Sequence, residues 1–204
     1  MSLVDTYRTI DKIFESEVFK DKGSKFIGYA FPVIDEGQIK IYIEELKSKH
    51  HKARHWCYAW RLGKENFRFR ANDDGEPGNS AGQPIYGQIQ SFDLTNVLVV
   101  VVRYFGGTKL GVSGLINAYK NAAKDVLEVS KIVVKTIDLH FVILFEYEHL
   151  DKVMRIIKDK NLTIVHQKME MSCEFEISVR KKEVESTLLA FENLRCLTIK
   201  EKEG

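Results

Sequence analysis

The sequence predicts an α+β protein of two domains, and three observations support this prediction. The chain has 204 residues, of which 44% are hydrophobic and 29% are charged, which suits folded domains and allows two of about 100 residues each. Segments with alternating apolar residues, typical of strands, are mixed with segments whose apolar residues recur every three or four positions, typical of helices. This succession starts again after Lys131, so we expect domains at residues 1–131 and 132–204.

The first domain is expected to begin with a hairpin and a helix. Residues 9–19 alternate loosely, the segment 22–25 suits a turn, and residues 26–33 are mostly apolar. Asp35 then begins a segment with one apolar face, which is formed by Ile39, Tyr42, Ile43 and Leu46. This spacing predicts a helix over residues 35–49.

Residues 55–62 alternate strictly and predict a strand. One side carries Trp56, Tyr58, Trp60 and Leu62, and the other carries His55, Cys57, Ala59 and Arg61. We expect the aromatic side to pack in a core, as alternating aromatic residues usually do. Residues 67–70 continue as a paired strand, followed by a polar loop over 71–84 and a short helix over 85–92.

Six consecutive apolar residues, 97–102, predict a strand that is buried on both faces. Arg103, two aromatic residues and a loop with four glycines follow, and a helical pattern begins directly after them. Glycine permits close backbone approach, and a helix N-terminus adds N–H donors and partial positive charge. We therefore expect an anion site formed by Arg103, Gly106, Gly107, Thr108, Lys109 and Ser113. The alternative is that the glycines only let the strand and the helix pack tightly.

This glycine-rich segment matches neither of the common nucleotide-binding motifs. A P-loop needs Lys-Ser or Lys-Thr after its last glycine, and the dinucleotide pattern Gly-x-Gly-x-x-Gly is also absent. Ser113 lacks the surroundings of a nucleophilic serine and is expected to cap the N-terminus of the helix instead.

Positive charge concentrates in residues 49–70, where seven Lys and Arg residues accompany a single acid, Glu65. A strand pair with cations on one face and aromatic residues beside them can neutralise phosphates and stack bases. Arg54, Arg61, Arg68 and Arg70 are therefore candidate RNA contacts. The alternative is a sheet whose basic face is only solvated.

The loop that follows contains three acids within four residues, Asp73, Asp74 and Glu76, and later Ser80 between Pro77 and Pro84. Such a loop can form a turn, hold a divalent cation, supply an acid or base beside Lys109 or His55, or pair with nearby Arg and Lys. Since calcium-loop spacing is absent, we expect a structural or recognition loop without a metal.

Histidines and cysteines give no sign of a metal or a nucleophile. His50, His51 and His55 lack further ligands at metal spacing and are expected to lie on the surface. The cysteines at positions 57, 173 and 196 cannot all pair, which favours a reducing cytoplasm, and Cys57 in mid-strand is expected to be inert. No apolar run reaches the length of a membrane span, and no motif indicates a cofactor.

The second domain is expected to alternate strands and helices in the order βαββαβ. Strand patterns cover residues 137–145, 162–166, 173–179 and 197–199, and helical patterns cover residues 149–158 and 181–193. This order within about 70 residues is typical of a ferredoxin-like domain.

Four stretches resemble the YigZ/IMPACT family in the right order. Residues 103–119 read RYFGGTKLGVSGLINAY, residues 23–28 read GSKFIG, residues 53–60 read ARHWCYAW, and residues 73–77 and 80–84 read DDGEP and SAGQP. The chain departs from the family pattern after Pro77, where it has Gly-Asn-Ser in place of Ser-Gly-Thr, so the resemblance carries no hydrogen-bonding role over to these positions.

The resemblance implies a fold and a context. The N-terminal domain of the family is similar to domain four of elongation factor G and to domain two of a small-subunit ribosomal protein. The C-terminal domain of the bacterial members is similar to domain five of elongation factor G. Eukaryotic members of the family are translation regulators. The resemblance and the basic segments together lead us to expect a cytoplasmic binding protein whose partner is RNA, the ribosome or a translation factor.

Two alternatives stay open. An enzyme acting on a phosphate-bearing substrate or on RNA would use the acidic loop, residues 73–76, and the glycine-rich loop, residues 106–114. A protein-interaction module would instead use the sheet of the second domain. We expect a binding protein rather than an enzyme.

Overall fold

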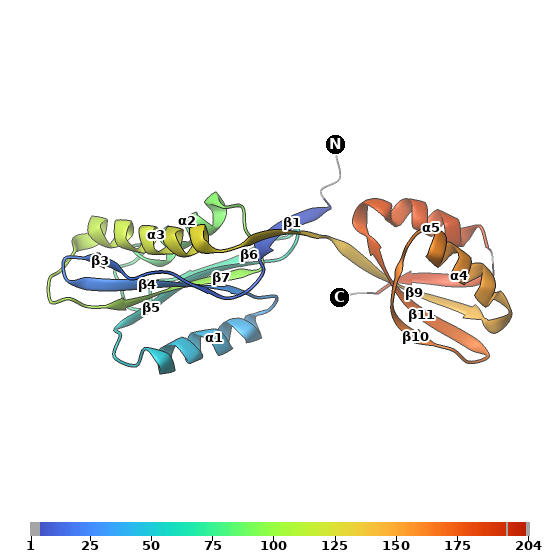
Figure 1. The fold of residues 1–204 in the computed structure, drawn as a ribbon, viewed down its shortest axis with the longest axis horizontal. Helices are drawn as coiled ribbons and strands as arrows, with labels where there is room; N and C mark the ends of the chain where they lie inside the picture. The colour runs from blue at the N-terminus through green and yellow to red at the C-terminus, as the bar shows by residue number, and fades with distance from the viewer. Residues whose placement is uncertain (1–4, 195, 203–204) are drawn as a thin grey trace. The chain divides into compact units, whose positions relative to one another are not determined.

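The computed structural model describes residues 5–194 and 196–202. These residues form two compact units (Figure 1), one of residues 7–135 and one of residues 136–202 together with Asp5 and Thr6. Strand β8 (Ile132–Thr136) pairs with β1 (Thr6–Ile10), so the first unit extends beyond the boundary expected at Lys131. Asp5 groups with the second unit because its carbonyl accepts from the Ile137 N–H (2.8 Å) and its carboxylate accepts from Arg180 Nε (2.6 Å).

The first unit contains a six-stranded antiparallel sheet with β7 (Val97–Tyr104) at its centre. The neighbours of β7 are β4 (Ser24–Pro32) and β5 (His55–Leu62). The remaining strands are β2 (Phe14–Glu15), β3 (Phe19–Asp21) and β6 (Arg68–Asn72). The expected hairpin turn is present between β3 and β4, but the first arm expected over residues 9–19 is divided among β1, β2 and β3, and β1 belongs to a different sheet. The expected pairing of residues 67–70 is present as β5 and β6.

Helices cover both faces of this sheet, which explains why Val97 to Val102 are all fully buried. Helix α1 (Glu36–Lys49) lies on one face, and α2 (Gly82–Ser91) and α3 (Gly111–Val129) lie on the other (Figure 1). Side chains of a strand alternate between faces, so Val97, Val99 and Val101 pack with α2 and α3, whereas Leu98, Val100 and Val102 pack with α1. The prediction of a strand buried on both faces is confirmed.

Strand β5 has a core on each side as well. Trp60 and Leu62 are buried in the core below α1, and Trp56 and Tyr58 pack against it, as the aromatic pattern predicts. On the other side, Cys57 and Ala59 are fully buried below α2 and α3. The alternative of a solvated basic face on this strand is therefore wrong, and so is an outward cationic face along it, because two helices cover that face.

The helix starts differ in how well the sequence predicts them. Asp35 caps α1 as expected, since its carboxylate accepts from the Gln38 N–H at 2.9 Å. Helix α2 begins at Gly82, three residues before the expected Ile85, and the carboxylate of Asp73 accepts from the Gly82 N–H at 2.8 Å. Ser113 lies inside the first turn of α3, whose cap position is Leu110, so the expectation that Ser113 caps this helix is wrong.

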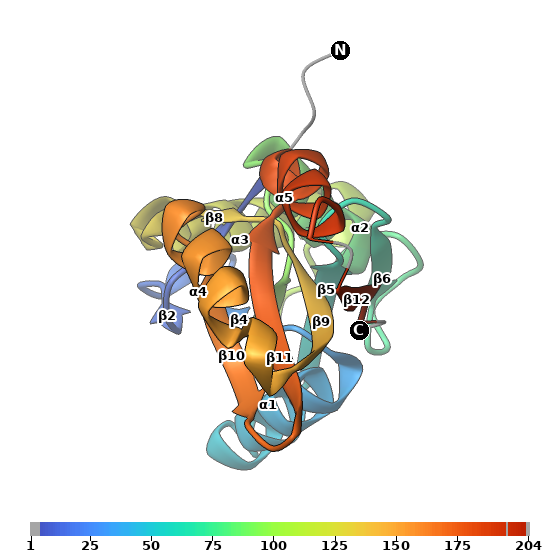
Figure 2. The ribbon, with the colours of Figure 1, turned by 90° about the vertical axis from the view of Figure 1, so that its right-hand side faces the viewer.

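The second unit has the predicted order of strands and helices. Its strands are β9 (Asp138–Glu146), β10 (Thr163–Lys168), β11 (Ser172–Arg180) and β12 (Leu197–Glu201), and its helices are α4 (Leu150–Asp159) and α5 (Val184–Glu192). The strands form an antiparallel sheet in the order β10-β11-β9-β12. Both helices pack on one face of this sheet (Figure 2), over a core that includes Val153, Phe175 and Phe191.

None of the helices in residues 5–194 and 196–202 combines the length and the apolar character that a membrane crossing needs.

Candidate anion-binding site at one end of the sheet

The glycine-rich loop lies at the end of the sheet where β7 stops and its two neighbours start. Lys25 at the beginning of β4 pairs with Tyr104, and His55 at the beginning of β5 pairs with Arg103. Antiparallel pairing therefore brings three segments that are far apart in the sequence to one edge. The loop at residues 105–110 leaves β7 there and leads into α3.

Gly106 and Gly23 let the loop meet the hairpin turn backbone to backbone. A Cβ on Gly106 would overlap the backbone of Gly23, and Gly23 itself has a φ of +80°. The Gly106 N–H also donates to Ser24 Oγ at 3.2 Å, so this expected anion donor is already used within the protein. Gly107, Thr108 and Lys109 are exposed. The packing interpretation thus applies to Gly106, whereas anion binding stays a prediction for the exposed residues of the loop.

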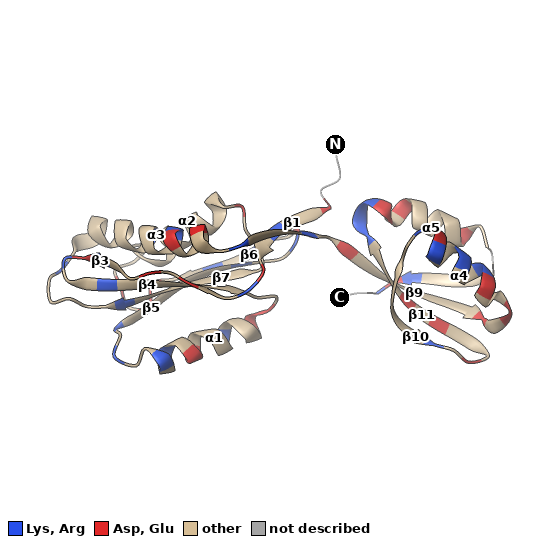
Figure 3. Cartoon of the chain, viewed as in Figure 1, with Lys and Arg blue, Asp and Glu red and all other residues tan. Residues whose placement is uncertain are grey.

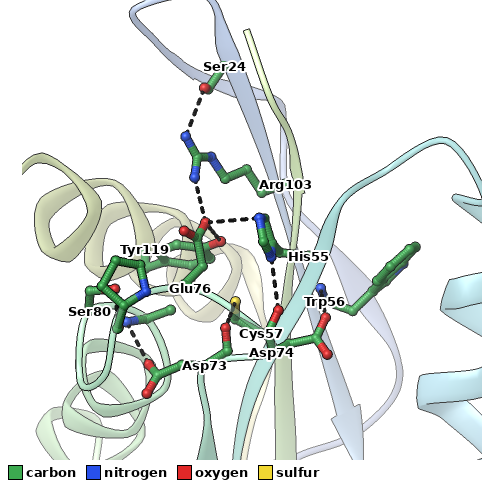
Figure 4. Close-up of polar contacts among 12 residues, drawn as sticks. Ser24, His55, Trp56, Cys57, Asp73, Asp74, Glu76, Ser80, Arg103 and Tyr119 are labelled. Atoms are coloured by element: carbon green, nitrogen blue, oxygen red, sulfur yellow. Dashed lines mark hydrogen bonds and ion pairs between the residues drawn. The ribbon is translucent and has the colours of Figure 1, made fainter. Parts of the chain in front are cut away.

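Arg103 does not present its charge to solvent, contrary to our expectation. The residue is 4% exposed, its Nη1 donates to Glu76 Oε1 at 2.5 Å, and its Nη2 donates to Ser24 Oγ at 3.3 Å (Figure 4). The reason is its position on β7: Arg103 continues the face of Val99 and Val101, which is covered by α3. The buried Arg103 is thus part of the wall below the site and not of an outward cationic surface.

Glu76 is the centre of the buried polar cluster. Its Oε1 also accepts from Tyr119 Oη at 2.7 Å and lies 3.9 Å from His55 Nε2 (Figure 4). Burial, the largest cause, and the neighbouring Cys57 and Glu76 raise the pKa of Tyr119, which keeps its hydroxyl protonated as a donor. Burial likewise raises the pKa of Cys57, whose thiol donates to the Asp73 carbonyl at 3.0 Å and stays neutral.

The other acids of the loop hold the backbone. The Asp73 carboxylate accepts from the N–H groups of Asn79, Ala81 and Gly82 at 2.8–2.9 Å. Asp74 Oδ2 accepts from the Trp56 N–H at 2.7 Å, and the Asp74 carbonyl lies 2.8 Å from His55 Nδ1.

Ser80 is buried as well, and its hydroxyl donates to the Pro77 carbonyl at 2.6 Å. Of the roles left open for this loop, the structure shows pairing with Arg103 and backbone capping. Among the described residues, no three His, Cys, Asp or Glu side chains gather in a way that suits a metal ion.

Five exposed cations surround this edge of the sheet, and we call them the cationic end: Lys22, Lys25, Lys52, Arg54 and Lys109. Basic segments gather there in Figure 3, where β4 and β5 begin. The backbone N–H of Arg54 donates to the Arg103 carbonyl at 3.0 Å, which ties that segment to the edge. None of the five forms an ion pair with another residue in the part of the chain that the structure describes.

Sequence reasoning finds Arg54 and Lys109 but misses Lys22, Lys25 and Lys52. The pattern at residues 22–25 predicts a hairpin turn, but the position of this turn beside the loop depends on the backbone contact between Gly23 and Gly106. The signal in the sequence that could have indicated this surface is the presence of cations in two glycine-containing segments, residues 22–25 and residues 106–114.

The remaining predicted cations lie at the opposite end of the sheet. Arg61 pairs with Val97, six residues along β5 from the pair of His55 and Arg103, which is about 20 Å away. Arg61 Nη1 donates to the Leu94 carbonyl (3.2 Å) and its guanidinium stacks over Phe67. Arg68 pairs with Glu36 at 3.2 Å, and Arg70 is exposed. The expected single basic surface is therefore divided in two, and Arg61 and Arg68 are engaged within the protein.

His50, expected on the surface, is buried between two tyrosines. Its Nε2 lies 2.7 Å from Tyr29 Oη and its Nδ1 lies 2.8 Å from Tyr104 Oη. Burial, the largest cause, and the nearby Lys49 lower the pKa of His50. His50 ends α1, so its position depends on where that helix stops against the sheet.

A pocket of about 320 Å³ opens beside the Arg103–Glu76 pair. Its wall includes Glu76, Arg103, Phe105, Lys109, Val112 and Leu115. Helix α3 begins at this pocket, its cap residue Leu110 makes no side-chain hydrogen bond to the helix, and its first turn contains no acid. The acidic loop and the glycine-rich loop, which the sequence singles out separately, therefore share one pocket.

Comparisons with known proteins agree on one family. The family model of the Impact N-terminal domain matches residues 22–127, which is more than half of the chain. IMPACT family member YvyE of Bacillus subtilis (strain 168) is 30% identical over 181 residues, with 89% of this chain and 83% of that protein covered. IMPACT family member YigZ of Escherichia coli (strain K12) is 32% identical over 131 residues, with 63% of this chain and 64% of that protein covered.

One solved structure is similar over nearly the whole length of this chain. The crystal structure of a hypothetical protein is similar with a TM-score of 0.74 and 25% identity, and the match covers 98% of this chain and 99% of that chain. This chain belongs to the IMPACT family.

Proposed function

We propose that this protein is a non-catalytic, cytoplasmic binding protein of the translation machinery and that its ligand is RNA. The observation that carries this proposal is the cationic end, where five exposed Lys and Arg side chains without ion-pair partners among the described residues surround an exposed loop. Unpaired cations of this kind neutralise phosphates and release counterions from RNA. The family resemblance, which implies a translation context, supports the same function.

We also propose the finer fold assignments that the resemblance implies. The strand order β10-β11-β9-β12 and the βαββαβ succession support a ferredoxin-like second domain similar to domain five of elongation factor G. The similarity of the first domain to domain four of elongation factor G rests on the resemblance alone. Both assignments are analogies of fold and add no residue to the site.

One observation favours an enzyme as the second candidate function. Glu76 and Lys109, from the acidic and the glycine-rich loops, line the same pocket. Against this function, Asp73, Asp74 and Glu76 all accept hydrogen bonds from groups of the protein itself. This function is tested by incubating the protein with nucleotides and short RNAs, in the presence of Mg²⁺ or of a chelator. Turnover of a substrate would support an enzymatic function, and unchanged substrates would support a function in binding alone.

The proposed function is tested with a fluorescein-labelled RNA hairpin titrated at several salt concentrations. The double variant Lys25→Gln/Lys109→Gln removes two charges from the cationic end. We expect weaker binding, and a plot of log affinity against log salt whose slope is shallower by about 0.7–0.9 for each phosphate that is no longer neutralised. The matched control Arg68→Gln/Arg70→Gln removes the same charge from the other end of the sheet and should bind like the original protein.

Equally weakened binding in the two double variants would show that only net charge matters, and binding that ignores salt would contradict the proposal directly. A ribosome-associated protein partner would show itself differently. In that case the Lys25→Gln/Lys109→Gln variant would sediment with ribosomal particles as well as the original protein does, although it binds the free RNA hairpin weakly.

A further inference from the structure

The pocket beside the cationic end has polar groups that the protein leaves unused. Glu76 Oε1 takes the contacts with Arg103, Tyr119 and His55, so Oε2 has no hydrogen bond among the residues that the structure describes. The buried Arg103 Nε, in the same wall, also has no partner within that part of the chain. The residues of the pocket wall thus contribute an acceptor, Glu76 Oε2, and a donor, Arg103 Nε, that the described part of the protein leaves unused. Arg103 Nε is buried, and buried polar groups normally have partners.

The mouth of the pocket is apolar and aromatic. Phe105 and Val112 are 43% and 53% exposed, although both are large hydrophobic residues. The Arg103 guanidinium, which donates to Glu76, lies 5.6 Å from the centre of the Phe105 ring. A half-exposed ring above an Arg is a stacking platform, since every nucleobase has a face that can stack on it.

The third part of the pocket suits a phosphate. Gly111 and Val112, the first residues of α3, line the pocket together with Lys109. The N–H groups of a first turn have no partner within their helix, and Leu110 at the cap position of α3 has no side-chain acceptor for them. An anion held there would gain from these donors, from the helix dipole and from the Lys109 charge.

A ligand that uses all three parts must be anionic at one end, flat and stackable in the middle, and able to donate an N–H at the other end. A nucleotide meets these conditions, whereas inorganic phosphate alone would leave Phe105 and Glu76 unused. The volume of about 320 Å³ limits the occupant to a single nucleotide.

We propose that this pocket binds one unstacked nucleotide of the RNA, with its base on Phe105 and hydrogen-bonded to Glu76, and its phosphate at Lys109 and the start of α3. This inference rests on the proposed function and deepens it. It also separates two roles at this edge of the sheet: Lys22, Lys25, Lys52 and Arg54 contact the backbone of the RNA, and the pocket takes a base.

The experiment compares Phe105→Ala with Phe69→Ala on a fluorescein-labelled single-stranded RNA of ten nucleotides and on a blunt RNA duplex of equal length. Phe69 is the matched control, because it is also exposed (53%) but lies on β6 at the other end of the sheet. We expect Phe105→Ala to weaken single-strand binding about tenfold without changing its salt dependence, as for removal of one base stack. Binding to the duplex should not change, since a paired base cannot enter the pocket.

The outcomes separate this inference from the proposed function. If Phe105→Ala binds single-stranded RNA as tightly as the original protein, while Lys25→Gln/Lys109→Gln binds weakly, the pocket takes no base and the proposed function stands. If Phe105→Ala weakens binding to the duplex and to the single strand equally, the proposal that the pocket binds an unpaired base would also be overturned. If the original protein binds neither RNA, both proposals fail. Unchanged thermal unfolding of Phe105→Ala shows that the variant is folded.

Discussion

Arg103 and Glu76 form an ion pair in which each side chain is only 5% exposed. Two charges in such surroundings lose their hydration, and each is tolerated only because the other is present. The pair joins the end of the central strand to the acidic loop, and Tyr119 adds a third group from α3. These few side chains therefore set the shape of the pocket wall.

Replacing one member of the pair should destabilise the protein more than replacing both. Arg103→Met leaves the Glu76 carboxylate buried without its cation, and we expect the free energy of unfolding to fall by about 3–5 kcal/mol. The double variant Arg103→Met/Glu76→Met removes both charges and should be more stable than the sum of the single changes implies. Urea denaturation of both single variants and the double variant measures this coupling, and additive effects would contradict it.

His50 gives the first unit a pH-dependent stability. Its pKa is lowered in the folded protein, mainly by burial and next by Lys49, so the unfolded chain takes up a proton first as the pH falls. We expect stability to be constant above about pH 6.5 and to decrease below it, by at most about 1.4 kcal/mol per pH unit.

Urea denaturation between pH 7.5 and pH 5 measures the effect, and His50→Gln should reduce the slope. Glu15, which faces the same cluster, does not interfere in this range. Burial, the largest single cause, raises its pKa, but the hydrogen bonds of Lys49 and Tyr29 and the charge of Lys49 together lower it, so its contribution disappears only at lower pH. An equal slope in His50→Gln would assign the effect to other groups.

At the scale of elements, one backbone contact holds the candidate site together. The loop after β7 can touch the turn before β4 only because neither Gly23 nor Gly106 has a side chain at the contact. Through this contact, Lys22 and Lys25 come to lie beside the loop that carries Lys109. Backbone packing thus assembles this edge of the sheet and determines where the charges of Lys22, Lys25 and Lys109 lie.

Gly106→Ala should therefore destabilise the first unit and weaken RNA binding. Its Cβ would overlap the Gly23 backbone, so the loop and the turn must separate. Gly87→Ala is the control: this glycine lies inside α2 with no atom near its Cβ position, and Ala should stabilise that helix by up to about 1 kcal/mol. Thermal unfolding and RNA titration of the two variants give the comparison, and a stable, fully binding Gly106→Ala would refute the role of the contact.

At the scale of the whole molecule, the two units have separate cores and different charge. Residues 1–131 contain 19 Lys and Arg against 16 Asp and Glu, whereas residues 132–204 contain 12 against 13. The cationic end belongs entirely to the first unit. We therefore expect the proposed RNA binding to depend on that unit and not on the second one.

A chain that ends at Thr136 should keep salt-sensitive RNA binding, because it retains both cores of the first unit and strand β8. A chain that ends at Lys131 lacks β8, leaves β1 unpaired and should unfold at a lower temperature. Thermal unfolding and titration of the labelled hairpin distinguish them. Failure of the chain that ends at Thr136 to bind RNA would show that the second unit takes part.

Much of the fold follows from local pattern. The run of apolar residues at 97–102 predicts the doubly covered strand, Asp35 and the spacing after it predict α1, and the alternation at 55–62 predicts β5. The order of elements in the second unit follows in the same way. These features depend on residues within a few positions of one another, which is the range that periodicity and capping signals describe.

The sequence by itself determined the family, the succession of elements in the second unit, most of the elements in the first unit, and the presence of cations and glycines in the right loops. Only the tertiary structure decided that Arg103 is buried, that Arg61 and Arg68 lie at the far end of the sheet, and that Lys22 and Lys25 join Lys109. The physical reason is the range of the contacts. Whether a cation faces water or a carboxylate depends on strand register and on backbone contacts such as that between Gly23 and Gly106, more than 80 residues apart.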